Sequence, residues 1–69
     1  MTERNWLVDL RKKAGLNQKE AAFRSGIKQP SYCEIEKGKS TPRIYTAKRI
    51  AEVLGFDWTL FFEETTEGK

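Results

Sequence analysis

Glycines divide most of the sequence into short stretches, and apolar residues recur at helical spacing within each stretch. Gly15, Gly26, Gly38 and Gly55 each follow such a stretch, in the place where a helix ends, and Gly26 is expected to be left-handed. The alternation of apolar and polar residues that is typical of a strand does not appear. The sequence therefore predicts an all-α fold of five short helices.

The first two helices have recognisable starts. An apolar face predicts the first helix, and its members are Trp6, Leu7, Leu10 and Ala14. Thr2 is placed to cap the start of this helix. Asn17 is followed three residues later by Glu20, which is the spacing of a capping box, and this predicts a second helix that ends at Gly26.

Three further helices are predicted downstream. The third runs from about residue 29 to residue 37, since Pro30 is tolerated in a first helical turn, and a loop follows it. The fourth has an apolar face made of Ile44, Ala47, Ile50, Ala51 and Leu54. Asp57 is placed to cap a last helix that carries Trp58, Phe61 and Phe62. Residues 1–62 are thus expected to form one compact domain, followed by an acidic, disordered tail at 63–69.

The 69 residues contain one cysteine and no histidine, which excludes several classes of site. A disulfide framework and a thiolate zinc site both need more than one cysteine. A hydrolase with a Ser–His or Cys–His pair is excluded because histidine is absent. The sequence also lacks the apolar run of roughly 18 residues that a membrane span needs, and its polar start leads into no signal peptide. We expect a small cytoplasmic binding module that is not an enzyme and holds no metal or cofactor.

The charge is unevenly distributed along the chain. The whole chain has 13 basic and 10 acidic residues, for a net charge of +3. Residues 63–69 hold three glutamates and one lysine, and the rest of the chain has 12 basic residues against 7 acidic ones. An excess of this size favours a polyanionic partner, although many small domains carry as much.

The stretch from Gln18 to Lys37 has the pattern of a helix-turn-helix motif. Ala22 is small where a second helix must cross close by, and Gly26 lies where the chain needs a left-handed turn. Three side chains are spaced to point inward and hold the angle between the helices, namely Ile27, Tyr32 and Ile35. An ordinary helical hairpin in a bundle is the alternative interpretation of this pattern.

Short segments along almost the whole chain form a second, more specific pattern. They are Leu10-Arg11, Gly15-Leu16-Asn17-Gln18, Glu20-Ala21-Ala22, Gly26-Ile27, Ile35-Glu36-Lys37-Gly38-Lys39, Pro42 and Ile50-Ala51-Glu52-Val53-Leu54-Gly55. In these segments the sequence resembles the lambda-repressor-like, or Cro/XRE, helix-turn-helix family. The resemblance implies a five-helix domain that places its third helix in the major groove of DNA, commonly as a dimer. It also implies transcriptional control, expected here to be repression at a palindromic operator in a bacterial or phage setting.

The resemblance further implies which side chains of the third helix read bases. Gln29 matches the first recognition position, where a glutamine can pair with N6 and N7 of adenine. Glu34 matches another reading position, where a carboxylate can accept from cytosine N4, and Ser31 and Cys33 lie beside them. Gln29 and Glu34 could instead be solvated helix residues, and Cys33 an incidental small residue rather than a redox-sensitive thiol.

Phosphate contacts are implied around that helix in the same way. Gln18 matches a glutamine that contacts a phosphate and braces the recognition helix. Basic residues of the turn and the following loop match positions that grip phosphates in the family: Lys28, Lys37, Lys39 and Arg43. Any one of these cations could equally be a solvated surface charge.

Two more positions match an ion pair of the family. Arg11 in the first helix and Glu36 near the end of the third are expected to form a partly buried, bidentate pair that fixes the recognition helix.

Three residues depart from the family pattern. Lys28 stands where Ser or Thr usually caps the third helix, Tyr32 replaces an aliphatic core residue, and Phe23 lies at a normally polar position.

The aromatic end of the chain and the exposed position of Phe23 suggest contacts with other protein chains. Leu60 and Phe62 are expected near the surface where related proteins dimerise, which predicts a weak homodimer that tightens on DNA. A monomer whose core is capped by these aromatics is the alternative.

The leading function is sequence-specific binding of double-stranded DNA for transcriptional control. The other is a protein-interaction module, such as an antitoxin subunit or a regulator that binds a co-regulator or toxin.

Overall fold

A computed structural model describes residues 3–66 of the chain, and within them the backbone forms five helices and no strand. The helices are α1 (Asn5–Lys13), α2 (Gln18–Ser25), α3 (Gln29–Glu36), α4 (Ile44–Leu54) and α5 (Leu60–Thr66). The predicted all-α fold is confirmed. No helix of this part of the chain is long and apolar enough to cross a membrane.

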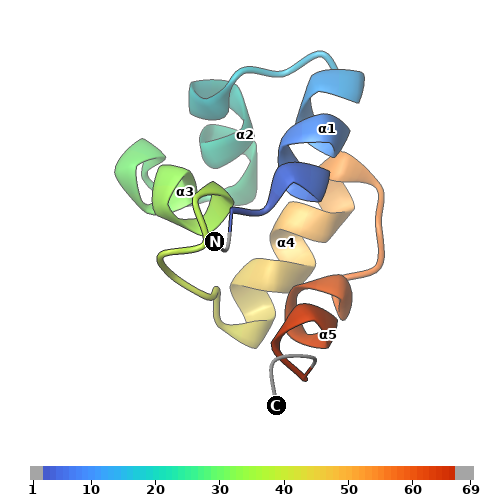
Figure 1. Cartoon of the computed structure of the whole chain (residues 1–69). Helices are drawn as coiled ribbons and strands as arrows, with labels where there is room; N and C mark the ends of the chain where they lie inside the picture. Colours follow the sequence, from blue (N-terminus) through green and yellow to red (C-terminus); the bar gives the residue numbers. More distant parts are fainter. Residues whose placement is uncertain (1–2, 67–69) are drawn as a thin grey trace.

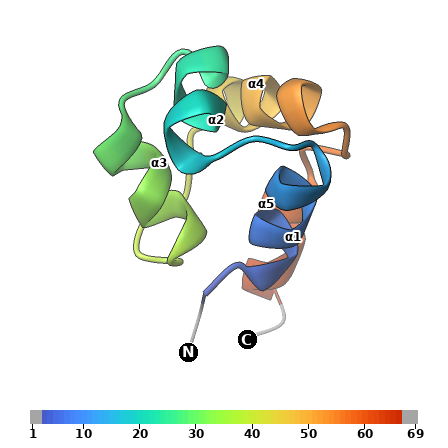
Figure 2. The same ribbon diagram turned by 90° about the horizontal axis from the view of Figure 1, so that it is seen from above.

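The arrangement of the helices leaves α3 at the outer edge of the molecule, as Figures 1 and 2 show in two views. α2 packs against both α3 and α4, and α3 also contacts α1. The segment before α1 passes close to the C-terminal end of α3, where the Arg4 amide donates to the Glu36 carbonyl at 2.8 Å. α3 is therefore held along one side and at its end by the rest of the fold.

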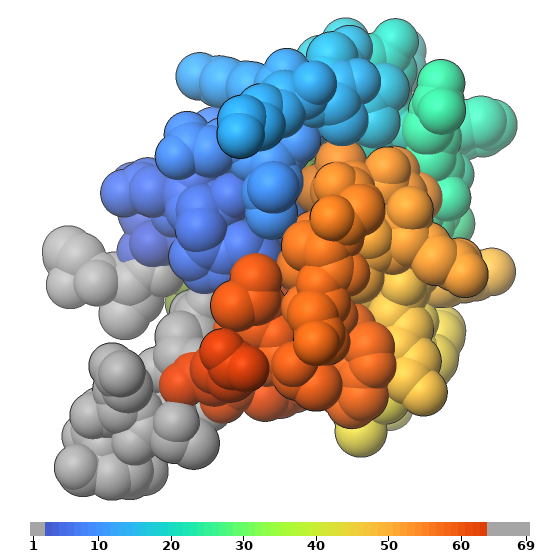
Figure 3. Space-filling model, turned by 90° about the vertical axis from the view of Figure 1, so that its right-hand side faces the viewer, coloured from blue at the N-terminus to red at the C-terminus, as the bar shows by residue number. Residues whose placement is uncertain are grey.

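The core combines side chains from all five helices. Its buried cluster consists of Leu7, Ala21, Ala22, Tyr32, Ile35, Ala47, Ile50, Leu54 and Phe61. Trp6, Phe56 and Phe61 meet edge to face, with ring centroids 5.3 to 5.6 Å apart. Figure 3 shows the face on which α1, in blue, lies against the α4–α5 region, in orange. These aromatic contacts join the first helix to the last.

The start of α2 is capped as the sequence predicts. The Asn17 side chain accepts from the Glu20 amide at 2.8 Å, and the Glu20 carboxylate accepts from the Asn17 amide at 3.0 Å. Both halves of the capping box are thus formed. Lys28 occupies the N-cap position of α3 and makes no side-chain cap hydrogen bond, because an ammonium has no acceptor to offer.

The apolar faces of α1 and α4 differ from the prediction at their edges. Ala14 caps the end of α1 and is exposed, whereas Arg11 is buried on that helix. Ile44 is 55% exposed, because it begins α4 at the margin of the buried face, and Thr46 is buried in that first turn. Ala14 and Ile44 therefore lie outside the buried faces to which the apolar pattern assigned them.

The last helix starts later than predicted. Asp57 accepts from the amide and the hydroxyl of Thr59, at 3.1 and 2.9 Å, and so closes a turn that contains Trp58. α5 begins at Leu60 and continues through residues 63–66 of the segment that was expected to be a tail. Residues 67–69 of that segment lie outside the described residues, as does Thr2.

Candidate nucleic-acid interface

The turn between α2 and α3 sets the angle of the helix-turn-helix. Gly26 has a φ of 76°, a conformation that residues with a side chain rarely adopt. Ala22 and Ser25 are each 1% exposed, so α3 and α4 can pack close to α2. The predictions of a small residue and of a left-handed turn in this motif are confirmed.

α3 turns one side to the body of the protein and the other to solvent. Tyr32, Ile35 and Glu36 face inward and are at most 4% exposed. Among the residues that the resemblance assigns to base reading, Gln29, Ser31 and Glu34 are exposed and Cys33 is half-buried. At about 100° per residue, Gln29 and Ser31 lie on the two flanks of the exposed side, and Glu34 lies between them.

The centre of the exposed side also carries two residues that the resemblance does not assign to base reading. Pro30 lies four residues before Glu34, and Lys37 lies three residues after it; both are exposed. Residues at these spacings are neighbours on a helix surface. The helical spacing from Glu34 was the signal that could have identified this row.

A chain of hydrogen bonds joins α1, α2 and α3 on the inner side. Arg11 Nε donates to Glu36 Oε2 at 2.6 Å, and Arg11 Nη2 donates to Glu36 Oε1 at 3.3 Å. Gln18 Nε2 donates to Glu36 Oε1 at 2.9 Å. The Cys33 thiol donates to Gln18 Oε1 at 2.9 Å. The orientation of α3 is thus fixed by side chains of both preceding helices.

This network places two predicted site residues differently from the others. The Cys33 thiol is directed toward α2, since Gln18 accepts from it, so only three of the four residues that the resemblance assigns to base reading are exposed. Gln18 is half-buried and braces α3 through Glu36. An amide nitrogen carries two hydrogens, so Gln18 has a second one for another acceptor.

The charges of the network favour the ionised pair. Burial alone would raise the pKa of the Glu36 carboxyl, but hydrogen bonds from Arg11 and Gln18 outweigh it and lower that pKa. The hydrogen bond to Glu36 raises the pKa of Arg11. Burial, and then the neighbouring Glu36 charge, raise the pKa of the Tyr32 phenol. Within the described residues, the Tyr32 and Ser25 hydroxyls are buried without a hydrogen-bond partner.

Basic residues stand at both ends of α3. The four that the resemblance assigns to phosphates are exposed, and they are Lys28 at the N-cap of α3, Lys37 at its C-cap, Lys39 in the loop and Arg43 at the N-cap of α4. Positively charged residues therefore both precede and follow α3 in the chain. Such an arrangement suits a polyanion.

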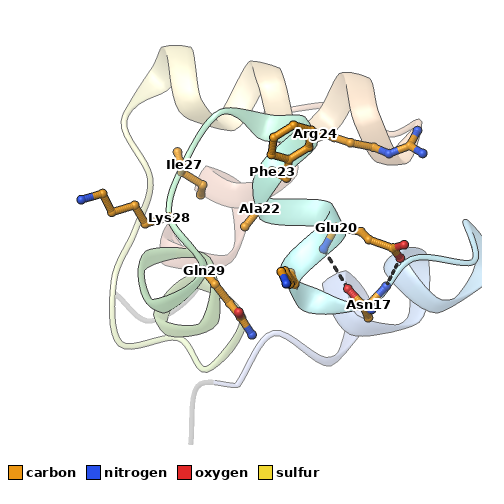
Figure 4. A pocket seen from close by; sticks show the side chains of 9 residues that line it. Asn17, Glu20, Ala22, Phe23, Arg24, Ile27, Lys28 and Gln29 are labelled. Atoms are coloured by element: carbon orange, nitrogen blue, oxygen red, sulfur yellow. Dashed lines mark hydrogen bonds between the residues drawn. The ribbon is translucent and has the colours of Figure 1, made fainter.

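An open groove of about 760 Å³ lies beside this surface, between the outer face of α2 and the turn into α3 (Figure 4). Its lining residues are Asn17, Lys19, Glu20, Ala22, Phe23, Arg24, Ile27, Lys28 and Gln29. Phe23 is 82% exposed, as expected for its position on α2. In Figure 4 the side chains of Arg24 and Lys28 extend in opposite directions from the groove.

Known proteins are similar to this chain in amino-acid sequence. The profile of the helix-turn-helix family matches residues 7–61. The uncharacterized HTH-type transcriptional regulator YqaF of Bacillus subtilis is 43% identical over 61 residues, which cover 88% of this chain and 80% of that protein. The HTH-type transcriptional regulator PuuR of Escherichia coli is 34% identical over 58 residues, 84% of this chain and 31% of that protein. Antitoxin HigA1 of Mycobacterium tuberculosis is 38% identical over 60 residues, 87% of this chain and 40% of that protein.

The match to the family profile covers most of the chain and includes the α2–α3 motif with its inward network. The chain spans less than half the length of PuuR and of HigA1, but most of the length of YqaF. The chain therefore belongs to the helix-turn-helix family, in its Cro/C1 type, and is a DNA-binding regulator of transcription.

Proposed function

We propose that the chain represses transcription by binding a specific double-stranded DNA site, with the outer side of α3 in the major groove. Gln29 pairs with an adenine, Glu34 accepts from a cytosine, and Ser31 contacts the flank of the site. The observation that carries this proposal is the separation of the two sides of α3. Its exposed side is polar, while Arg11, Gln18 and Glu36 lock its inner side.

Phosphate contacts provide most of the affinity in this proposal. Lys28, Lys37, Lys39 and Arg43 neutralise backbone phosphates on both sides of α3, and Gln18 donates its second amide hydrogen to another. Each neutralised phosphate contributes about −0.9 to the slope of log Kobs against log salt concentration. Binding is therefore expected to weaken steeply with salt. The protein acts where bacterial DNA lies, in the cytoplasm.

Selection of bound sequences from a random DNA pool tests the proposal. We expect an enriched palindromic site, and Gln29→Ala is expected to relax the preference at one base pair, at a cost of about 1–3 kcal/mol. Lys39→Ala, at an exposed loop position outside α3, serves as the control, because it is expected to weaken binding to all sequences and reduce the salt slope by about 1. An unchanged preference in Gln29→Ala would reject Gln29 as a base reader, and no enrichment at all would reject the function.

A homodimer is part of the proposal, since a palindromic site has two equal halves, expected about 34 Å apart. Leu60 and Phe62 are both half-buried on α5, and Phe62 packs edge to face against Trp58 at 5.9 Å between ring centroids. Leu60 is the better candidate for the dimer contact, because it is absent from the apolar side chains that pack against the core in the described residues.

A protein-interaction module is the second candidate function. One relative is named an antitoxin, and this chain has a groove beside an exposed Phe23. A stable complex with a co-regulator or toxin, together with DNA binding that is absent or insensitive to salt, would favour this candidate over the first.

A further inference from the structure

Arg4 is a buried arginine that precedes α1 and contacts three other parts of the fold. It is 3% exposed. Its Nη1 donates to the carbonyls of Ile35 at 2.6 Å and Ser40 at 2.9 Å, and its Nη2 donates to Thr41 Oγ1 at 3.3 Å. Its guanidinium also lies over the Phe61 ring, 5.5 Å from the centroid. One side chain thereby connects the start of the fold with the end of α3, the following loop and α5.

The contacts at the end of α3 satisfy its last carbonyl groups, which have no partners within the helix. The amides of Gly38 and Lys39 donate to two of these carbonyls in a Schellman motif. Arg4 adds its own amide to the Glu36 carbonyl at 2.8 Å and its guanidinium to the Ile35 carbonyl. A cation at this place also faces the negative end of the α3 dipole.

The contacts in the loop bear on DNA binding. Ser40 and Thr41 lie between Lys39 and Arg43, the two exposed loop cations assigned above to phosphates. We propose that Arg4 is a positioning residue for DNA binding, which holds this loop against the end of α3 so that both reach one duplex together. The inference rests on the proposed function. Because Arg4 is itself buried, its effect on DNA must pass through the parts that it contacts, namely the loop and the end of α3.

The shape of the side chain explains why an arginine is needed. Two nitrogens of one planar group donate to three oxygens, two of them on the loop, while the face of the same group lies on an aromatic ring. A lysine ammonium is a single point of charge and cannot reproduce these contacts together.

The test compares Arg4→Met and Arg4→Lys with Lys13→Met, which removes the same charge from an exposed position of α1. Affinity for a short duplex of random sequence is measured over a series of salt concentrations, at a temperature where circular dichroism shows each variant folded. We expect Arg4→Met to flatten the slope of log Kobs against log salt by about 1 to 2, since each lost phosphate contact removes about 0.9. Arg4→Lys should lie between Arg4→Met and wild type, and Lys13→Met should keep the wild-type slope.

A wild-type slope in folded Arg4→Met overturns the proposal and leaves Arg4 a merely stabilising residue. If Arg4→Met does not fold, the same comparison applies to Arg4→Lys. Amide hydrogen exchange gives a readout without DNA, because the loop amides should exchange faster in the Arg4 variants while the Ala21 amide of α2 keeps its protection. If the wild type binds no duplex, the proposed function fails, and unchanged exchange in the loop is what would then reject the role of Arg4.

Discussion

Arg11 and Glu36 meet at two points, with Nε 2.6 Å from Oε2 and Nη2 3.3 Å from Oε1, and this contact joins α1 to the last turn of α3. Their side chains are 11% and 3% exposed. The net stabilisation from such a pair is often small, because both charges lose their hydration, whereas removal of one partner strands the other. The pair therefore constrains the orientation of α3 more than it adds to the stability of the fold.

Replacement of Arg11 by alanine tests how far the pair is buried. The Glu36 carboxylate would lose its main partner in a buried place, so we expect a loss of about 3–5 kcal/mol in the free energy of unfolding. Lys12→Ala, an exposed neighbour on α1, is the control and should change that free energy by less than about 0.5 kcal/mol. Urea unfolding gives both values. A loss below about 1 kcal/mol for Arg11→Ala would mean that the pair behaves as a surface pair.

The stability of the protein should fall in acid because of Glu36. The pKa of this carboxyl is lower in the folded protein than in the unfolded chain, where it is about 4.3. Its contribution is therefore complete above the unfolded pKa and is lost as the pH falls through the lower folded pKa. Unfolding free energies measured across this range should decline less steeply in a double variant, Arg11→Met with Glu36→Met. Equal declines would assign the acid sensitivity to other carboxyls.

Tyr32→Phe is expected to preserve or increase stability. The Tyr32 hydroxyl is buried beside the Glu36 carboxylate and the Arg11 guanidinium, which both act on its pKa, but it forms no hydrogen bond of ordinary geometry among the described residues, and a buried hydroxyl without one costs about 1–3 kcal/mol. We expect a gain of up to about 1 kcal/mol in thermal or urea unfolding, since the ring itself remains. Tyr45→Phe is the matched control, because Tyr45 is 64% exposed and its hydroxyl can reach water. A clear loss in Tyr32→Phe alone would show that Glu36, Arg11 or a bound water satisfies the hydroxyl.

Gly26→Ala and Gly15→Ala form a second matched pair. Both glycines have a φ of 76°, and a left-handed residue with a Cβ costs about 1–2 kcal/mol. A Cβ at Gly26 would also lie 2.7 Å from Arg49 Nη1, whereas nothing lies within 4 Å of one at Gly15. Arg49 is exposed and its end can move, so we expect both variants to lose similar stability. A much larger loss at Gly26 would mean that Arg49 is held in place.

Leu60→Ser tests the proposed dimer contact. Sedimentation at micromolar concentrations, with and without the selected DNA site, should show a dimer for the wild type on DNA and a shift toward monomer for this variant. Ile44→Ser is the control, since Ile44 is an exposed apolar residue of α4 outside the proposed contact. A strict monomer for the wild type in both conditions would reject the dimer.

Local signals in the sequence were sufficient for most of the fold. The Asn17–Glu20 spacing and the glycine after α2 each act over a few residues, and both features formed as predicted. The edges of helices were harder to predict. Ile44 fits an apolar pattern, but only the packing of neighbouring helices decides that the buried face begins at Thr46.

The exposure of candidate site residues was predictable where it follows the family pattern, and less so where it depends on contacts between distant residues. The positions of Gln29 and Glu34 follow from their distance to the turn. Arg4 could not be identified, because the hydrogen-bond partners of its side chain are 31 to 37 residues away and no spacing rule connects them. The direction of the Cys33 thiol likewise depends on Gln18, which lies on another helix.

The separation of the two sides of α3 also bears on how such a protein can change its target. Gln29, Ser31 and Glu34 are exposed, whereas the side chains that hold the helix in place are different residues on its other side. If these three residues read bases as proposed, substitutions at their positions alter which DNA is bound at little expense to folding. Under that proposal a new binding preference arises by changing three surface residues, and duplicated copies of the domain diverge in target while they keep one scaffold.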